Sequence, residues 1–190
     1  MNKLLFTIMA LIASMAAVAQ SADKLYAEGK AFYDAKNYTA ALPKLKAAAE
    51  KGHRKAQYRL GRCYDKGHGV EENDKLAFEW YKKSAAQDYA KAQYQLGKCY
   101  KNGEGVDKDR KKAVEWFAKA ARQDNADAQL ALGKSYLKGK GIAADPKKAK
   151  SWLLKAVNNP KGGADVLAEL RSDAAGGDED AKAILALIGK

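Results

Sequence analysis

Two histidines, His53 and His68, and two cysteines, Cys63 and Cys99, are the side chains of this 190-residue sequence best suited to metal binding or catalysis. A zinc site needs three or four such ligands, and a nucleophile needs a base beside it. Neither histidine has a Cys, Asp or Glu at a recurring ligand spacing, and no serine has a base at a recognisable spacing. We therefore predict no catalytic residue, metal or cofactor, and we expect both histidines to be solvent-exposed loop residues.

The elements that must position any site come from three copies of one segment, at a period of 36 residues. Residues 56–64, 92–100 and 128–136 share the pattern Ala-Gln-x-x-Leu-Gly-x-x-Tyr. Repeats of this length are typical of solenoids built from helix pairs. Asp74 and Asp145 are expected to cap the second helices of copies one and three, because aspartate is a good N-cap. The copies are assigned to residues 54–90, 91–126 and 127–160.

Glycines in each copy indicate how its two helices meet. A Gly-x-Gly pair after the first helix can adopt positive φ and reverse the chain. A glycine inside the first helix costs about 1 kcal/mol relative to alanine, which favours close contact with the second helix. A tryptophan at helical spacing is expected in the core. These residues are the turn glycines Gly67, Gly69, Gly103, Gly105, Gly139 and Gly141, the helix glycines Gly61, Gly97 and Gly133, and the tryptophans Trp80, Trp116 and Trp152.

Segments on both sides complete the array. Residues 23–53 form a shortened helix pair that lacks the Gly-x-Gly turn. Residues 161–190 are expected to contain two helices, at 164–175 and 178–188. Because an array of repeats exposes its core at both ends, these helices are predicted to cap the open end.

The pattern Ala-x-x-x-Leu-Gly-x-x-Tyr-x-x-Gly-x-Gly-Val, followed by Ala-x-x-Trp-Tyr, resembles the Sel-one-like repeat (SLR) family over residues 54–160, and residues 23–53 are similar to a tetratricopeptide repeat. The resemblance implies an all-α fold, a right-handed α-solenoid of antiparallel helix pairs. It also implies a scaffold or adaptor that binds partner proteins on its concave face, often in the bacterial envelope. Some cysteine-rich secreted members are linked to β-lactam binding or hydrolysis, and their cysteines pair the two helices within each repeat.

Cys63 and Cys99 occupy equivalent positions in copies one and two, where copy three has Ser135. Equivalent Cα atoms on stacked helices lie about 9–10 Å apart, whereas a disulfide needs less than about 7 Å. No cysteine falls in a second helix, so the pairing of the cysteine-rich members is absent. Two buried free thiols are the favoured interpretation; a disulfide formed in an oxidising compartment is the alternative.

One face of the first helices predicts a basic groove. Positions 58, 62 and 65, and their equivalents in copies two and three, share this face at i, i+4 and i+7. If first helices line the concave side, as the resemblance implies, these cations and tyrosine rings suit an acidic or C-terminal peptide segment. The alternative is a solvated basic face without a ligand. The predicted groove residues are Tyr58, Arg62, Asp65, Tyr94, Lys98, Lys101 and Lys134.

Residues 1–19 are predicted to be a cleavable bacterial signal peptide. Lys3 precedes an uncharged apolar run, and Ala17 and Ala19 match the small-x-small cleavage pattern. The apolar run is shorter than the roughly 20 residues of a membrane span. We therefore expect no integral membrane span after cleavage, and a periplasmic or secreted protein.

The net charge of +12 favours acidic partners. The leading hypothesis is a non-enzymatic scaffold for a protein or peptide partner. A binder of anionic cell-wall glycan or lipopolysaccharide is one alternative. A β-lactam or cell-wall hydrolase is a weaker one, because it rests on family analogy and lacks a nucleophile–base pair. Nucleic-acid binding would fit the positive net charge, but it does not fit the predicted signal peptide, and the sequence contains no nucleic-acid-binding motif.

Overall fold

The computed structural model describes residues 21–190, and ten helices form the secondary structure of that part of the chain. The predicted signal peptide, residues 1–19, lies outside the described residues. Between residues 21 and 190 there is no strand, so the all-α prediction is confirmed, and no helix there is long and apolar enough to span a membrane. The helices are α2 (Ala22–Asp34), α3 (Tyr38–Glu50), α4 (Arg54–Lys66), α5 (Asp74–Ala85), α6 (Ala90–Asn102), α7 (Arg110–Arg122), α8 (Ala126–Lys138), α9 (Pro146–Val157), α10 (Gly163–Ala175) and α11 (Glu179–Ile188).

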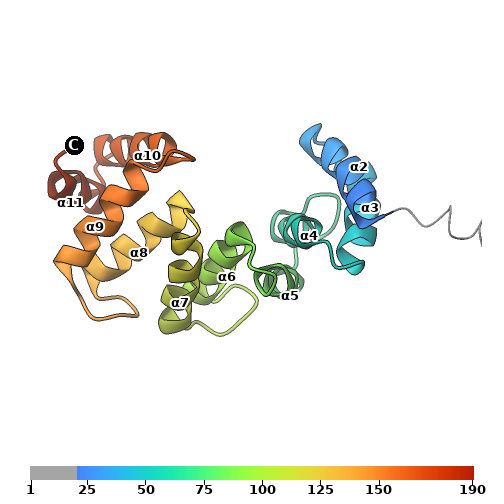
Figure 1. The fold of residues 1–190 in the computed structure, drawn as a ribbon, viewed down its shortest axis with the longest axis horizontal. Coiled ribbons are helices and arrows are strands. Elements are labelled where there is room, and N and C mark those ends of the chain that lie inside the picture. Colours follow the sequence, from blue (N-terminus) through green and yellow to red (C-terminus); the bar gives the residue numbers. More distant parts are fainter. Residues whose placement is uncertain (1–20) are drawn as a thin grey trace, which may run out of the picture.

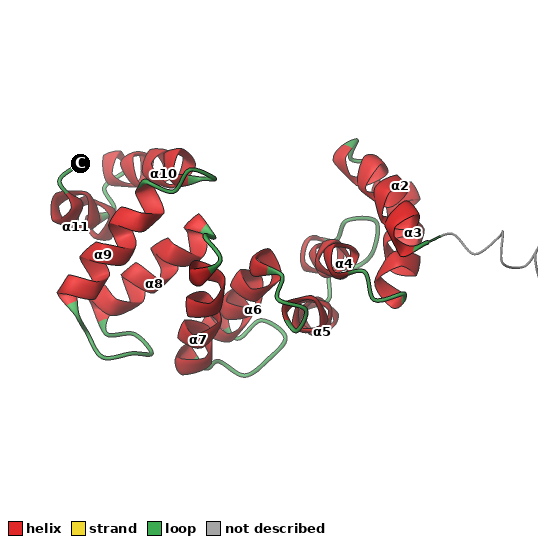
Figure 2. Ribbon diagram, in the orientation of Figure 1, coloured by secondary structure: helices red, strands yellow, loops and turns green. Residues whose placement is uncertain are grey.

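The helices stack as pairs into a curved array (Figure 1). Helices α4, α6 and α8, the first of each copy, lie on the inner side of the arc, and α5, α7 and α9 lie on its outer side. Loops between the helices carry no further secondary structure (Figure 2). The array is the α-solenoid that the 36-residue period predicts, with the first helices on the concave side.

Glycines inside the first helices allow the two helices of each copy to approach closely. A Cβ atom added to Gly97 in α6 would lie 2.5 Å from the ring of Phe117 in α7 and 3.2 Å from the carbonyl oxygen of Ala113. Any larger residue would force the pair apart, because a packed core tolerates little extra volume. In the other copies Gly61 faces Tyr81, and Gly133 faces Leu153.

The second glycine of each turn packs against the preceding repeat. Gly105 has φ +68°, and a Cβ atom there would lie 2.1 Å from the carbonyl oxygen of Asp74, at the start of α5. Gly141 has φ +81° and a similar approach of 2.2 Å to the carbonyl oxygen of Arg110, at the start of α7. Both the backbone conformation and the contact therefore require glycine. Positive φ is also found at the remaining predicted turn glycines, Gly67, Gly69, Gly103 and Gly139.

Asn73, and not the predicted Asp74, caps α5. The side-chain oxygen of Asn73 accepts a hydrogen bond of 2.9 Å from the backbone N–H of Leu76, whereas Asp74 is the first residue of the helix. The prediction was wrong by one residue because Asn and Asp are comparable N-caps. Asp145 caps α9 as predicted, and Pro146 follows it in the first turn.

The three tryptophans are half-buried and lie at the margin of the core, where each packs against a hydrophobic cluster. That cluster contains residues of the preceding helix pair and of the first helix of the tryptophan's own copy. A lysine three residues later covers the ring, and this cation–π contact needs the ring to be accessible from one side. The buried core position is one residue further on, at Tyr81, Phe117 and Leu153. The tryptophan–lysine pairs are Trp80 and Lys83 at 4.2 Å, Trp116 and Lys119 at 4.0 Å, and Trp152 and Lys155 at 4.5 Å.

Helices outside the three copies cover both ends of the core. Leu153 of α9 belongs to one cluster with Leu170 of α10 and Ile184 of α11. These helices confirm the two that the sequence predicts after copy three. At the other end, Leu45 of α3 belongs to one cluster with Leu60 of α4.

Both histidines pack against tyrosines of the N-terminal helix pair, so the expectation of solvent-exposed loop residues was wrong. The ring of His53 stacks on Tyr26 with centroids 4.2 Å apart. His68 stacks on Tyr38 at 4.0 Å, and its Nδ1 atom lies 3.0 Å from the hydroxyl oxygen of Tyr33. The histidines therefore join α2 and α3 to copy one. The repeat pattern does not predict these contacts, because the tyrosines come from a segment that departs from the repeat.

Candidate binding pocket

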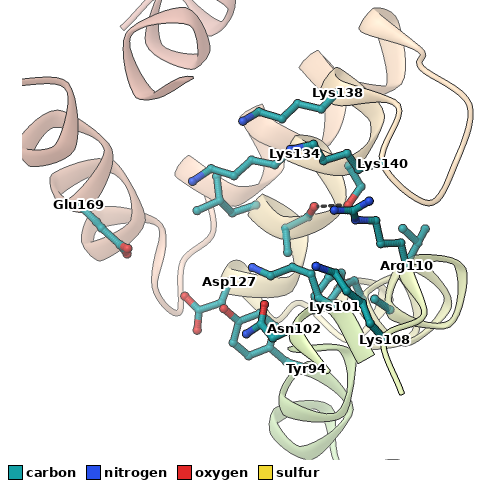
Figure 3. A pocket seen from close by; sticks show the side chains of 16 residues that line it. Tyr94, Lys101, Asn102, Lys108, Arg110, Asp127, Lys134, Lys138, Lys140 and Glu169 are labelled. Carbon is teal, nitrogen blue, oxygen red and sulfur yellow. Dashed lines mark hydrogen bonds between the residues drawn. The ribbon is translucent and has the colours of Figure 1, made fainter. Parts of the chain in front are cut away.

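A pocket of about 460 Å³ lies between copies two and three. Its lining comes from α6, α7 and α8, from the two turns that follow α6 and α8, and from Glu169 of α10 (Figure 3). The first helices of two consecutive copies thus form its sides, and the C-terminal cap contributes one residue from beyond the repeats.

The floor of the pocket is apolar. Val114 and Phe117 rise from α7, while Leu130 and Ala131 come from α8, with the Tyr94 ring of α6 beside them. Phe117 and Val114 are core residues held by the close packing of α6 against α7. A rigid apolar floor of this kind can accept an aliphatic side chain of a ligand.

Cations surround this floor. Of the six, only Lys138 has an ion-pair partner among residues 21–190, the Asp180 carboxylate of α11. Five unpaired cations around one pocket create a positive potential that attracts carboxylates. The six cations are Lys101, Lys108, Arg110, Lys134, Lys138 and Lys140.

The crowding of cations affects Lys101 directly. Partial burial lowers the pKa of its ammonium group, and the positive charges of Lys98 and Lys134 lower that pKa further. Both causes disfavour the charged form. An anion bound beside Lys101 would offset the repulsion between these ammonium groups.

Two carboxylates, those of Asp127 and Glu169, also line the pocket. Figure 3 shows them on one side of the pocket and Lys108, Arg110 and Lys140 on the other, with the side chains of Lys101 and Lys134 reaching toward the carboxylates. Burial raises the pKa of the Tyr94 hydroxyl group to about 12, and the negative charges of Asp127 and Glu169 raise this pKa by smaller amounts. Both carboxylates of the pocket therefore lie on one side of it, and cations line the rest.

Three of the predicted groove residues, Tyr94, Lys101 and Lys134, meet in this pocket. Lys98 does not line it, although its charge acts on Lys101. The other three residues do not line it either.

Tyr58, Arg62 and Asp65 instead make contacts within the molecule. The Tyr58 ring packs edge-on against that of Tyr89, with centroids 5.4 Å apart. The Arg62 guanidinium group lies 6.0 Å from the ring of Tyr33 in α2. Asp65 accepts a hydrogen bond of 3.1 Å from the Tyr81 hydroxyl group. Arg62 therefore contacts the N-terminal helix pair, whereas Tyr58 and Asp65 contact aromatic residues of copy one itself.

Six charged residues of the pocket were missed from the sequence: Lys108, Arg110, Lys138, Lys140, Asp127 and Glu169. Lys108 and Lys140 lie in turns, Arg110 opens α7, and Glu169 belongs to the cap. The face at i, i+4 and i+7 of the first helices contains none of these four. The presence of a charge reversal at Asp127 could have been found, since Lys55 and Lys91 occupy the same position in copies one and two.

Cys63 and Cys99 are buried and unpaired, as the favoured interpretation predicted. They lie in different hydrophobic clusters, Cys63 with Leu60 and Cys99 with Leu96. Burial raises the pKa of the Cys63 thiol to about 11 and that of the Cys99 thiol to about 12. Because the thiolate is the reactive form, neither residue is suited to nucleophilic chemistry.

The three repeats of the sequence, each a pair of helices, match one family model. The Sel1 repeat model matches residues 54–89, 90–125 and 126–160. The chain belongs to the Sel1 repeat family. Proteins of this family generally act as scaffolds for protein–protein interaction and are typically non-catalytic. No curated protein matches this chain significantly in sequence.

Solved structures show the same fold. A Sel1 repeat protein from Oxalobacter formigenes is 32% identical over 85% of this chain and 74% of its own, with a TM-score of 0.68. A protective antigen of uropathogenic Escherichia coli with an SLR fold is 26% identical over 93% of this chain, with a TM-score of 0.72, and this chain spans 47% of it. Cysteine-rich protein B of Helicobacter pylori is 26% identical over 74% of this chain and 94% of its own, with a TM-score of 0.52.

Proposed function

We propose that this Sel1 repeat protein is an exported, non-enzymatic scaffold that binds an acidic or C-terminal peptide segment of a partner protein in the pocket between copies two and three. The observation that carries the proposal is the set of five cations without an ion-pair partner in the described part of the chain, placed around an apolar floor. Carboxylates of the partner would pair with these cations, and an aliphatic side chain would cover Leu130 and Ala131.

Lys101 and Lys134 are assigned the central role in carboxylate binding. They come from equivalent faces of α6 and α8, so a ligand that contacts both must lie across the junction of two copies. The lowered pKa of Lys101 supports this assignment, since a bound carboxylate would relieve the repulsion from Lys98 and Lys134.

Export is the second part of the proposal. It rests on residues 1–19, whose basic start, apolar run and small-x-small end match a signal peptide. The mature protein would act in the periplasm or outside the cell. Cell fractionation, together with the intact mass of the recovered protein, tests this: cleavage before Gln20 is expected, and an uncleaved cytoplasmic chain would contradict it.

The binding proposal is tested by fluorescence anisotropy with a labelled peptide that carries an apolar residue and two carboxylates near its C-terminus. The variant is Lys101→Glu with Lys134→Glu. The matched control is Lys147→Glu with Lys150→Glu, which makes the same change in net charge at exposed positions of α9 outside the pocket. We expect the pocket variant to lose at least tenfold in affinity, as for two charge-assisted contacts of about 1 kcal/mol each, and the control to bind like the wild type.

An anionic envelope polymer is the competing ligand. Such a polymer would be held by the basic surface as a whole, so the pocket variant and the control would weaken it equally, and salt would remove it. Equal weakening of peptide binding by both variants would contradict the proposed pocket.

A further inference from the structure

The charge of the pocket changes sign along α8. At the register position occupied by Lys55 in copy one and Lys91 in copy two, copy three has Asp127. Asp127 lines the pocket and is exposed. Asp127 therefore belongs to copy three, whose first helix, α8, contacts α10 of the C-terminal cap.

The cap adds a second carboxylate at the same end. Glu169 of α10 lines the pocket from beyond the repeats, and Figure 3 shows it on the same side as Asp127. Neither carboxylate has an ion-pair partner among residues 21–190. Two unpaired carboxylates facing one pocket favour a cation there.

The distance between the two ends follows from helix geometry. Lys134 and Lys138 come seven and eleven residues after Asp127 on α8. At about 1.5 Å per residue, they lie roughly 10 and 16 Å along the helix axis from it. An extended peptide advances about 3.3 Å per residue, so three to five residues cover that span. Leu130 and Ala131 form the apolar floor in between.

We infer that the pocket selects a mixed-charge peptide segment, one that carries Lys or Arg three to five residues away from a carboxylate, with an apolar residue between them. This inference rests on the proposed function and names the chemistry of its partner. The carboxylate pairs with Lys134 and Lys101, and the positive side chain of the ligand lies between Asp127 and Glu169. A polyanion is disfavoured, because its chain would place negative charge beside both carboxylates.

Two synthetic peptides test this selection. Both carry an N-terminal fluorescein and a Gly-Gly-Ser spacer; one ends in Lys-Ala-Leu-Ala-Glu and the other in Glu-Ala-Leu-Ala-Glu, each with a free C-terminus. At low ionic strength the wild-type protein is expected to bind the lysine peptide about threefold more tightly, the size of one exposed ion pair. Equal affinity, or a preference for the glutamate peptide, would overturn the inference.

Asp127→Lys restores the residue that the other two copies have at this position and is expected to reverse the preference. Asp173→Lys makes the same charge change at an exposed residue of α10 outside the pocket, and it should keep the wild-type preference.

If both peptides bind equally and Lys101→Glu with Lys134→Glu abolishes binding, the selection fails while the proposed function stands. If neither peptide binds, both fail. Lipopolysaccharide binding that Asp127→Lys strengthens would point to a polyanion instead.

Discussion

The side-chain nitrogen of Asn159 donates a hydrogen bond of 2.9 Å to the side-chain oxygen of Gln129, thirty residues earlier in the chain. Gln129 in turn donates to the backbone carbonyl of Ala121, 3.3 Å away, in the last turn of α7. Helix ends leave such carbonyls without a partner inside the helix. The buried amide of Gln129 therefore gives the end of α7 a second donor, besides the backbone N–H of Asp124, and also holds Asn159 after the end of α9.

The same arrangement occurs in all three copies. Each first helix has a buried glutamine in its first turn, and an amide thirty residues later in the same copy donates to it. Each glutamine also donates to a carbonyl of the preceding helix, so the amide ladder joins each copy to the helix pair before it. Its three rungs are Gln57 with Gln87 at 2.8 Å, Gln93 with Gln123 at 2.7 Å, and Gln129 with Asn159 at 2.9 Å.

Replacing Gln93 should therefore destabilise the middle of the array. Gln93→Ala removes two hydrogen bonds: the 3.4 Å bond to the Ala85 carbonyl, which keeps the backbone N–H of Asp88 as a donor, and the bond that Gln93 accepts from Gln123. We expect the free energy of unfolding to fall by about 1–3 kcal/mol, measured by urea denaturation. Lys91→Ala, at an exposed position of the same helix, is the control and should change it by less than about 0.5 kcal/mol.

Gly97→Ala tests the close packing of α6 on α7. On helix propensity alone alanine would stabilise the helix by about 1 kcal/mol. The contact of 2.5 Å with the Phe117 ring instead predicts a loss of about 1–3 kcal/mol. Phe117→Leu, which copies the residue that faces Gly133 in copy three, should reduce the penalty of Gly97→Ala in the double variant. An unchanged or higher thermal midpoint for Gly97→Ala would contradict this packing.

Acid should weaken the junction between the N-terminal helix pair and copy one. Burial lowers the pKa of both His53 and His68, and the Arg62 charge lowers that of His68 further. In the unfolded chain a histidine takes up its proton near pH 6.5. Below that pH the unfolded state binds more protons, so the free energy of unfolding decreases as the pH falls. His53 also needs a neutral Nδ1 to accept the N–H of Ala56 at 3.1 Å.

The matched variant combines His53→Asn with His68→Phe. Asparagine preserves the cap, as Asn125 does for α8, and phenylalanine preserves an aromatic ring against Tyr38. Unfolding in urea at pH 7.0 and pH 5.5 should then show a smaller difference than in the wild type. A wild-type pH dependence in this variant would exclude the histidines as its cause.

Cys63 and Cys99 should react with thiol reagents only after unfolding. Both are buried, and the raised pKa of each thiol reduces its thiolate fraction at pH 8. Alkylation followed by intact-mass analysis should show no label on the native protein and two labels in denaturant without a reductant. Two labels that appear only after reduction would demonstrate a disulfide instead.

The helical framework could be read from the sequence because its determinants recur in every copy. Gly97 and Gly105 each have an equivalent glycine 36 residues away in both directions, so the sequence shows that glycine is required at these positions of the repeat. The amide ladder was not predicted, although Gln57, Gln93 and Gln129 recur at the 36-residue period. A glutamine in a helix is usually exposed, and only tertiary packing places its amide next to a helix end.

The pocket could be predicted only in part, for the opposite reason. Tyr94, Lys101 and Lys134 lie on one repeated helix face, which the periodicity reveals. Arg110 and Glu169 reach the pocket through the curvature of the array and the docking of α10, and neither follows from a local pattern. Tyr58 and Arg62 share the repeated face but contact aromatic rings of their neighbours instead.

The most direct test of the central claim is lysine footprinting of the native protein with and without a saturating acidic peptide. Acetylation is followed residue by residue by mass spectrometry, with the exposed Lys147 and Lys150 as internal references. The peptide is predicted to protect Lys101 and Lys134 and to leave Lys147 and Lys150 unchanged. Equal rates at Lys101 and Lys134 with and without bound peptide would contradict a ligand site between copies two and three.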